Sequence, residues 1–286
     1  MNPQMKKVTY YIEVHLDDVL DLQVLAKVAG YSPYHFCRVF KLHIGESAMS
    51  YASRLKLERA ASEVTYAKKS MIEIALDAGY QTPTGFLKAF KARFGTTPTA
   101  YKKSTLHFTE IYKESTMKDI KIVQREEVQV VFTRETGYYE TSSDLAWKKL
   151  DESLNGLEEV FRKNPPQIEI NLDEDGAETL GICHDDPSIT DEANIRYDAA
   201  ISWSKEKVDV LGTYGFETKT IAGGKYAVTE YMGDYTVAGE AWGTLYAWIE
   251  KNGYTFRDEP PFEKYLNAWN EKGSNKIETE VYVPIV

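Results

Sequence analysis

Residues 72–101 read IEIALDAGYQTPTGFLKAFKARFGTTPTAY, and they contain the local signals of two helices joined by a tight turn. Ser70 and Glu73 form a capping box at the start of an apolar run with helical spacing, and Gly79 ends that run. Thr82 is a good N-cap residue, and the proline after it suits the first turn of a second helix. The stretch therefore predicts a helix-turn-helix unit.

The same pattern occurs about fifty residues earlier in the chain. The residues that recur with an offset of 49 or 50 are Ala26, Ala29, Gly30, Tyr31, Phe40, Lys41, Gly45 and Tyr51. In this first copy Asp21 and Ser32 are the expected helix N-caps. Between the copies, residues 49–66 predict a long helix that includes Arg54 and Arg59. We therefore expect an all-α region with two helix-turn-helix units and a helix that links them.

The charge of the chain is unevenly distributed. Residues 1–105 contain 15 Lys and Arg and 9 Asp and Glu, which gives a net charge of +6, although the whole chain has a net charge of -10. Residues 106–286 therefore have a net charge of -16. A basic region that precedes a strongly acidic one indicates two modules with different partners, and only the first is suited to phosphates.

The first hundred residues resemble a known family of DNA-binding proteins. The repeated A-G-Y, the F-K before a glycine and the closing T-P-x-x-Y occur in the order that is typical of AraC/XylS-type transcription regulators, over about residues 5–104. This resemblance implies that two helix-turn-helix units bind adjacent major-groove segments of double-stranded DNA. The implied recognition helices are about residues 33–41 and 83–91.

Six side chains on these two helices are candidates for contacts with base edges. They are Tyr34, Cys37, Arg38, Pro83, Thr84 and Lys88. Arg38 is the strongest candidate because a guanidinium can donate two hydrogen bonds to guanine O6 and N7. A phosphate contact or a plain surface charge is the alternative for Arg38. Lys88 and Gly85 depart from the family pattern, which suggests a less specific readout by the second helix.

The length of 286 residues fits two domains, and a polar segment marks the boundary between them. We expect a DNA-binding domain at 1–105, a linker at 106–118 and a second domain at 119–286. In the second domain, apolar residues alternate between a period of two and a period of three to four. This pattern predicts an α+β domain.

The second domain contains an approximate internal repeat. Residues 128–132 alternate like a strand, and an apolar helical stripe follows over 147–161. A strand-like segment at 225–231 and a helical stripe that begins at Trp242 repeat this order. The expected architecture is a pseudo-duplicated set of antiparallel strands with packed helices.

This half of the chain resembles the GyrI-like effector-binding domain. The segments that carry the resemblance are GGKYAVTEYMGDY at 223–235, PPFEKYL at 260–266 and EVYVPI at 280–285, and the resemblance covers about residues 117–286. The order of an AraC-type reader followed by a GyrI-like domain is similar to that of the Rob-type regulators. The resemblance implies a small-molecule effector.

Glu263 is the candidate for the centre of the effector site. Its strand places it on the same side as Tyr265, and a carboxylate among aromatic rings is costly unless a cation binds there. The resemblance implies that this glutamate meets cationic, aromatic ligands. A salt-bridged glutamate at the rim is the alternative. The candidate wall residues are Tyr226, Tyr231, Trp242, Tyr246, Tyr265 and Tyr282.

Other chemical signals are weak. The sequence has no HExxH, P-loop, G-x-G-x-x-G or G-x-S-x-G motif. Residues 183–186, Cys-His-Asp-Asp, have metal-ligand types, but neighbouring side chains on an extended chain point in opposite directions, so we expect an exposed loop. Cys37 and Cys183 form no CxxC pair. We therefore expect no metal site, no cofactor and no disulfide framework.

The combined expectation is a cytoplasmic, ligand-responsive transcription regulator and not an enzyme. Its partners would be promoter DNA and a small, cationic, hydrophobic effector, and the resemblance implies activation through RNA polymerase. No apolar run of about 18 residues and no signal-peptide pattern occurs, so no membrane association is expected. Two alternatives stay open: a hydrolase of electrophilic small molecules that uses Glu263, and a module that sequesters another protein.

Overall fold

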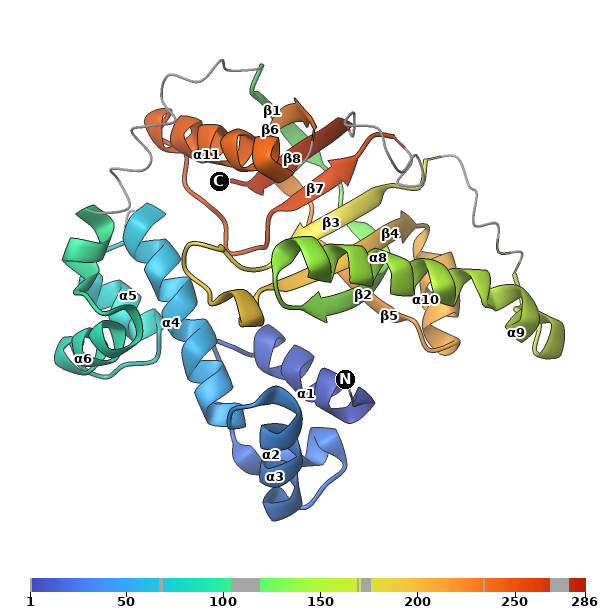
Figure 1. Cartoon of the computed structure of the whole chain (residues 1–286), viewed down its shortest axis with the longest axis horizontal. Helices are drawn as coiled ribbons and strands as arrows, with labels where there is room; N and C mark the ends of the chain where they lie inside the picture. The colour runs from blue at the N-terminus through green and yellow to red at the C-terminus, as the bar shows by residue number, and fades with distance from the viewer. Residues whose placement is uncertain are drawn as a thin grey trace. The chain divides into compact units, whose positions relative to one another are not determined.

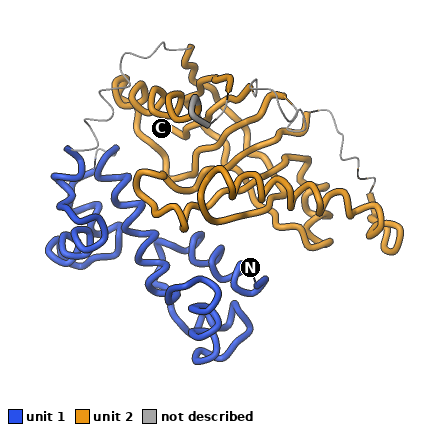
Figure 2. Tube along the Cα trace, in the orientation of Figure 1, with its two compact units in different colours: residues 1–107 blue, residues 108–286 orange. Residues whose placement is uncertain are grey.

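The computed structural model divides the chain into two compact units, unit 1 (1–107) and unit 2 (108–286), as Figure 2 shows. The residues that the structure describes are 2–66, 69–103, 119–168, 170, 176–233, 235–267 and 278–286. The predicted linker at 106–118 lies outside the described residues, so the domain boundaries stay predictions. Within the described ranges, no helix has the length and apolar character needed to cross a bilayer.

Unit 1 is helical, and its helices begin where the sequence places N-caps. The helices are α1 (Pro3–Val14), α2 (Leu22–Ala29), α3 (Pro33–Ile44), α4 (Ala48–Tyr66), α5 (Met71–Asp77) and α6 (Pro83–Phe94). The side chains of Asp21, Ser32 and Thr82 each accept a hydrogen bond from a backbone N–H in the first turn of α2, α3 or α6. Ser70 and Glu73 form the predicted capping box of α5. The predicted pair of helix-turn-helix units is confirmed.

The two helix-turn-helix units are packed on different parts of α4 (Figure 1). Buried residues of α1, α2 and α3 share one cluster with the first half of α4, which contributes Tyr51 and Leu55. The second half of α4 contacts α5 and α6, and it buries Ala61 and Val64. Phe36 and Phe40 of α3 are 0% exposed, so one side of this helix is held by the core.

Unit 2 contains one antiparallel sheet of eight strands with helices packed against it (Figure 1). The strands are β1 (Lys121–Arg125), β2 (Val128–Thr136), β3 (Thr179–Cys183), β4 (Arg196–Trp203), β5 (Glu217–Ile221), β6 (Gly224–Met232), β7 (Phe262–Tyr265) and β8 (Glu278–Pro284). The helices are α8 (Tyr139–Asn155), α9 (Leu157–Lys163), α10 (Lys205–Thr213) and α11 (Tyr235–Lys251), with a short 3-10 turn at Glu192–Asn194. The strand order is β1-β6-β8-β7-β3-β4-β2-β5.

The order of the strands confirms the predicted duplication. The first half runs β2, α8, β3, β4 and the second half runs β6, α11, β7, β8. In the sheet the second half appears as β6-β8-β7 and the first half as β3-β4-β2, so the two halves mirror each other about the β7–β3 pair. One predicted helix is divided in two, because the apolar stripe over 147–161 is interrupted at Gly156, where α8 ends and α9 begins.

Two short connections curl the sheet. Residues 126–127 join β1, at one end of the sheet, to β2 near the other end, and residues 222–223 join β5 to β6 in the same way. Two residues span only about 7 Å, so the ends of the sheet must approach each other. The backbones of the connections are close, since a Cβ added at Gly223 would lie 2.8 Å from the amide nitrogen of Glu127.

The two faces of the sheet are packed differently. On the helix-covered face, Trp147 and Leu150 of α8 share a buried cluster with Tyr197 of β4, and Leu245 of α11 shares another with Val281 of β8. On the opposite face, apolar residues of β2, β3, β4, β6, β7 and β8 form a single cluster. Strands near both ends of the sheet contribute to that cluster, as the curl requires.

Candidate functional site

In unit 1, the predicted recognition helices α3 and α6 present the six candidate DNA-contacting residues to solvent. Pro83, Thr84 and Lys88 are exposed on α6. Cys37 and Arg38 are exposed on α3, together with Tyr34, which is 74% exposed. Each helix buries two phenylalanines on its other side, at matching positions of the repeat. The cores therefore hold both helices with their candidate side chains outward.

The matched positions of α3 and α6 differ in chemistry. Arg38 and Lys88 are separated by 50 residues, the offset of the repeat, and so occupy equivalent positions. The Arg38 guanidinium carbon lies 5.8 Å from the centre of the Tyr34 ring. The residue equivalent to Tyr34 in α6 is Thr84, which has no ring. An arginine that lies over a ring is better suited to a planar, two-bond contact than a flexible lysine.

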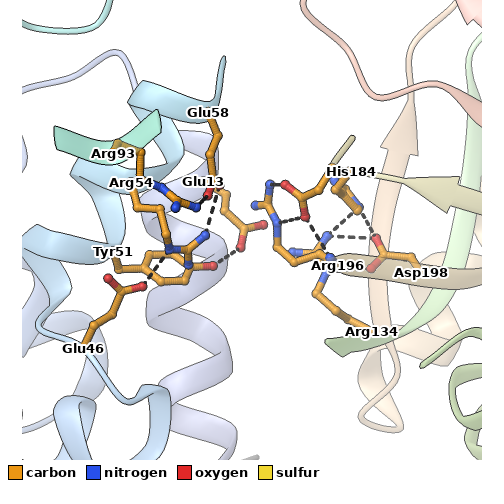
Figure 3. Close-up of polar contacts among 11 residues, drawn as sticks. Glu13, Glu46, Tyr51, Arg54, Glu58, Arg93, Arg134, His184, Arg196 and Asp198 are labelled. Carbon is orange, nitrogen blue, oxygen red and sulfur yellow. Dashed lines mark hydrogen bonds and ion pairs between the residues drawn. The ribbon is translucent and has the colours of Figure 1, made fainter. Parts of the chain in front are cut away.

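The arginines of α4 form ion pairs with other residues of unit 1. Arg54 donates from Nε to Glu46 at 2.9 Å and from a terminal nitrogen to Glu58 at 3.1 Å (Figure 3). Arg59 is paired with Asp17. The two arginines therefore stabilise the helical unit, and exposed side chains on α3 and α6 remain the candidates for DNA contact.

In unit 2, Glu263 is 1% exposed and accepts three hydrogen bonds. Its Oε1 atom accepts from the Tyr231 hydroxyl at 3.1 Å and from the Trp242 indole N–H at 3.0 Å. Its Oε2 atom accepts from the Tyr265 hydroxyl at 2.9 Å. The structure thus brings four of the seven predicted ligand-binding residues together, and they come from β6, β7 and α11.

The hydrogen bonds continue from Glu263 into the first half of the pseudo-repeat. The hydroxyls of Tyr265 and Tyr197 lie 3.0 Å apart, and the Trp147 indole N–H donates to Tyr197 at 2.9 Å. Trp147 on α8 and Trp242 on α11 occupy corresponding helices of the two halves. We call Glu263, Tyr231, Trp242, Tyr265, Tyr197 and Trp147 the Glu263 cluster. Both halves contribute donors to it.

The electrostatics of Glu263 reflect two opposing effects. Burial raises the pKa of Glu263 above its usual range, and the hydrogen bonds from Trp242, Tyr265 and Tyr231 partly oppose this rise. Burial and the nearby carboxylate also raise the pKa of the Tyr231 hydroxyl, which therefore remains a donor. A buried acceptor surrounded by rings can hold a cation through charge pairing and ring faces.

The local sequence pattern does not reveal two residues of this site, Tyr197 of the cluster and Gly181 beside it. Tyr197 is 0% exposed, and its pattern indicates only a strand. Gly181 lies beneath the two hydroxyls, since a Cβ there would be 2.3 Å from the Tyr197 oxygen and 2.7 Å from the Tyr265 oxygen. Gly181 pairs with Glu263 across β3 and β7. No local pattern reveals such a position, because strand pairing creates it.

The other three predicted wall residues lie elsewhere. Tyr226 and Tyr282 belong to the cluster on the opposite face of the sheet, where Tyr282 stacks on Phe262 at 4.8 Å between ring centres. Tyr246 of α11 stacks on Phe256 and is tilted against Trp242. Side chains alternate between faces along a strand, so Tyr226 and Tyr231, five residues apart on β6, must lie on opposite faces.

The prediction of an exposed loop at residues 183–186 is wrong, because none of the four residues is exposed. Cys183 ends β3 and is 7% exposed. The Asp185 side chain is 4% exposed and accepts from two nitrogens of Arg196, at 2.9 Å from Nε and 2.7 Å from a terminal nitrogen. The charge of Arg196, from the paired strand β4, compensates the buried carboxylate.

His184 belongs to a second buried group of charges, shown in part in Figure 3. Asp198 is 0% exposed and pairs with Arg134 at 2.6 Å, with His184 at 2.7 Å and with Lys219. Burial lowers the pKa of His184 to about 4. Burial alone would raise the pKa of Asp198, but the charges of Arg134, Lys219 and His184 hold it well below its usual range. We call these four residues the Asp198 cluster.

The described residues contain no group of three or more His, Cys, Asp or Glu side chains that could hold a metal ion. The carboxylates of Asp198 and Asp185 are instead paired with arginine, lysine and histidine side chains. These groups are therefore ion-pair networks.

Comparison with known families agrees with this division of the molecule. The profile of the GyrI-like small molecule binding domain matches residues 118–286, which is more than half of the chain. The profile of a helix-turn-helix domain matches residues 25–104.

Several known proteins are similar to parts of the chain. The TetD protein of transposon Tn10 from Escherichia coli is 36% identical over 102 residues, which are 36% of this chain and 74% of TetD. The probable transcriptional regulator YgiV of Escherichia coli strain K12 is 30% identical over 110 residues, 38% of this chain and 68% of YgiV. The transcriptional regulator Rob of Salmonella typhimurium is 33% identical over 95 residues, 33% of each chain.

Rob is named as a transcriptional regulator and YgiV as a probable one, which agrees with the prediction of a regulator. The two profiles match the two parts of the chain in the predicted order, first the helix-turn-helix domain and then the GyrI-like domain. The chain therefore belongs to the GyrI-like family and is a DNA-binding transcription regulator of the AraC type with a C-terminal small-molecule-binding domain.

Proposed function

We propose that this regulator binds promoter DNA through α3 and α6 and responds to a small, hydrophobic cation that binds at Glu263. The observation that carries the proposal is the Glu263 cluster, in which a carboxylate 1% exposed is surrounded by tyrosines and tryptophans that donate to it. The proposed domains are residues 1–105 for DNA and 119–286 for the effector, joined by a linker at 106–118.

The dimensions of α4 support the DNA-binding part. A helix of 19 residues is about 28 Å long at roughly 1.5 Å per residue. Successive major-groove segments on one side of B-DNA are about 34 Å apart. Because the two helix-turn-helix units are packed on different parts of α4, this helix holds their recognition helices apart, as binding to adjacent segments requires. Tyr34, Cys37 and Arg38 of α3 would face one segment.

The second recognition helix would face the other segment with Pro83, Thr84 and Lys88, all of which are exposed. We assign specific readout mainly to Arg38, because its guanidinium matches guanine geometry. Lys88 fits a phosphate contact better, since an ammonium group is a point charge without planar geometry.

The chemistry of Glu263 supports a cationic effector. An uncharged ligand would leave the buried carboxylate with its hydrogen bonds but without an opposite charge, whereas a cation would stabilise its ionised form. The rings of Tyr231, Trp242 and Tyr265 would hold the apolar part of the ligand. Tyr246, next to Trp242, fits the rim of this site.

The remaining parts of the proposal concern regulation. We assign the protein to the cytoplasm and to activation through RNA polymerase, as the resemblance to AraC/XylS regulators implies. The effector regulates only if it has different affinities for the active and inactive arrangements of the protein.

Selection of DNA from a random duplex pool by the full chain tests the function. We expect enrichment of one bipartite sequence, with binding that weakens steeply as salt rises. Addition of cationic aromatic dyes should change the affinity for the selected duplex. Failure to enrich any sequence would refute DNA recognition, and an affinity unchanged by every dye that binds would refute effector control.

Glu263→Gln tests the charge at the effector site. We expect it to lower the affinity for a cationic dye by about tenfold or more, because a hydrogen-bonded charge contributes roughly 1.5–3 kcal/mol. A neutral dye of the same ring system should lose much less. Glu280→Gln is the matched control, because Glu280 lies on the neighbouring strand β8 and bonds to Lys121 and Tyr282 instead.

The pH dependence gives an independent readout of the same charge. Because the pKa of Glu263 is raised by burial, dye binding should weaken as pH falls through that raised pKa, where the carboxylate becomes protonated. Glu263→Gln should remove this dependence. Equal losses of the cationic and neutral dyes, or an unchanged pH profile, would exclude charge pairing with Glu263.

A further inference from the structure

In unit 1, the two recognition helices belong to separately packed helix-turn-helix units on α4, so their relative orientation needs more than apolar contacts. The first core contains α1, α2, α3 and the first half of α4. The second half of α4 contacts α5 and α6. Apolar packing is non-directional, whereas hydrogen bonds between charged groups fix angles as well as distances. Polar contacts along α4 can therefore orient α6 relative to α3.

Glu58 of α4 bonds to Arg54 and to Arg93, as Figure 3 shows. Its side chain is 5% exposed and its two carboxylate oxygens accept from different arginines. Oε2 accepts from Arg54, one turn earlier on α4, at 3.1 Å. Oε1 accepts from Arg93, in the last turn of the recognition helix α6, at 2.8 Å. Glu58 therefore ties the end of α6 to the middle of α4.

Arg54 extends this link to the first helix-turn-helix unit. Its Nε donates to Glu46, which follows the end of α3, at 2.9 Å. Its guanidinium carbon lies 5.0 Å from the centre of the Tyr51 ring, and the Tyr51 hydroxyl donates to Glu13 of α1 at 2.8 Å. We call Glu46, Arg54, Glu58 and Arg93 the Glu58 cluster. It connects the C-terminal ends of both recognition helices through two adjacent turns of α4.

We propose that the Glu58 cluster sets the spacing of the two DNA segments that the protein recognises, because it fixes the orientation of α6 relative to α3. A buried carboxylate is costly unless its charge is matched, so Glu58 favours the one arrangement in which both guanidiniums reach it. Glu58 is thus a positioning residue for sequence recognition. This inference rests on the proposed binding of DNA by both helices.

The geometry of DNA makes the proposal measurable. One added base pair moves the second segment by about 3.4 Å and rotates it by roughly 35° around the duplex axis. Two linked recognition helices bind tightly only when both can engage at once. If the link is rigid, the protein should therefore bind much more weakly to a duplex with a changed spacing. If the link is loosened, the protein should bind duplexes of several spacings, with a lower affinity for the best one.

The experiment uses the full chain and the duplex that it selects from random DNA. Spacers of one, two and five base pairs are inserted between the two selected segments, and a further duplex keeps only the first segment. We expect the unmodified protein to lose about tenfold or more in affinity on a one-base-pair insertion, as rigid bivalency requires. Glu58→Gln should reduce that loss to roughly threefold or less, while binding to the single-segment duplex stays within about twofold.

Two further variants separate orientation from folding. Arg93→Gln removes the link to α6 but leaves Arg54 and Glu46 in place, so it should relax the spacing preference like Glu58→Gln. If a single variant does not fold by circular dichroism, the double variant Glu58→Gln with Arg93→Gln carries the test, because it leaves neither charge buried alone. Glu63→Gln is the matched control, since Glu63 is on the same helix and pairs with Lys69.

The outcomes distinguish this inference from the proposed function. Relaxed spacing in the Glu58 and Arg93 variants, with the preference retained in Glu63→Gln, supports the positioning role. A spacing preference unchanged in folded Glu58 and Arg93 variants overturns it while DNA recognition stands. An equal loss of affinity for every duplex also overturns it. Such a loss means that less protein is folded, which weakens binding to all spacings by the same factor. If the unmodified protein selects no DNA, the proposed function itself fails.

Discussion

The two units differ in where they place the side chains that carry their predicted functions. In unit 1 the candidates on α3 and α6 are exposed and each stands on a helix whose cap and period are visible in the sequence. In unit 2 Glu263 is 1% exposed, and its donors come from three different elements. Side chains that contact DNA must be exposed on the protein surface, whereas the side chains of a small-molecule site must enclose the ligand.

This contrast extends to charge. The buried charges of unit 2, at Asp198 and Asp185, are matched by ion pairs across neighbouring strands. In unit 1, Arg38 and Lys88 remain exposed. Substitutions in the two sets should therefore change different properties: stability in unit 2 and DNA binding in unit 1.

The largest expected effect is that of Asp198→Asn. It would take the shared carboxylate from Arg134 and Lys219, whose side chains are largely buried, and removal of one partner from a buried pair costs about 3–5 kcal/mol. Chemical denaturation followed by tryptophan fluorescence measures the loss in unit 2, which contains all five tryptophans. Asp209→Asn, in an exposed pair with Lys205, should change stability by less than about 0.5 kcal/mol. A similar loss of stability in Asp198→Asn and Asp209→Asn would contradict the expected difference between a buried and an exposed ion pair.

His184 should make the stability of unit 2 sensitive to acid. Its pKa is lowered by burial to about 4, below the usual 6.5, so the unfolded chain binds the proton first as pH falls. The contribution is complete above pH 6.5 and is lost between about pH 6.5 and 4, to a total of roughly 3 kcal/mol. His184→Gln should flatten this part of the profile, measured by denaturation at each pH. The exposed His43→Gln should leave it unchanged.

Arg38→Ala should affect DNA recognition without affecting stability. Loss of a two-bond contact to guanine should reduce discrimination against the wrong base by about 1–3 kcal/mol. Competition between the selected duplex and single-base variants measures it. Lys27→Ala, an exposed change on α2, should leave discrimination intact. Unchanged discrimination in a folded Arg38 variant would remove its assigned role.

The smallest expected effect is that of Lys88→Ala. If Lys88 contacts a phosphate, all duplexes should weaken by the same factor, and the salt dependence of log affinity should decrease by about one unit of slope. A change in base preference at one position would instead assign base readout to Lys88. That result would make the two recognition helices equivalent in chemistry as well as in position.

Much of unit 1 follows from local sequence. Caps at Asp21, Ser32 and Ser70 and the left-handed Gly30, with a φ of 70°, act within a few residues, so the helix boundaries were predictable. The repeat with its offset of 50 also placed Arg38 and Lys88 at equivalent positions. The Glu58 cluster was not predictable, because Glu58 and Arg93 are 35 residues apart and meet only when α6 packs on α4.

In unit 2 the sequence predicted the strands, the duplication and a grouping of Tyr231, Trp242 and Tyr265 with Glu263, but not the residues that pairing of the strands adds to them. The alternation of side chains along β6 could have separated Tyr226 from Tyr231. The contributions of Tyr197 and Gly181 depend on the pairing of β3 with both β4 and β7.

The sequence by itself therefore determined the order of the two domains, the helix-turn-helix repeat and the α+β duplication, because caps, periodicity and repeats are properties of nearby residues. Only the tertiary structure decided which tyrosines donate to Glu263, why His184 and Asp185 are buried, and how α3 is tied to α6. Those contacts join residues distant in the chain, and their energies depend on strand order, register and helix packing, which no local pattern records.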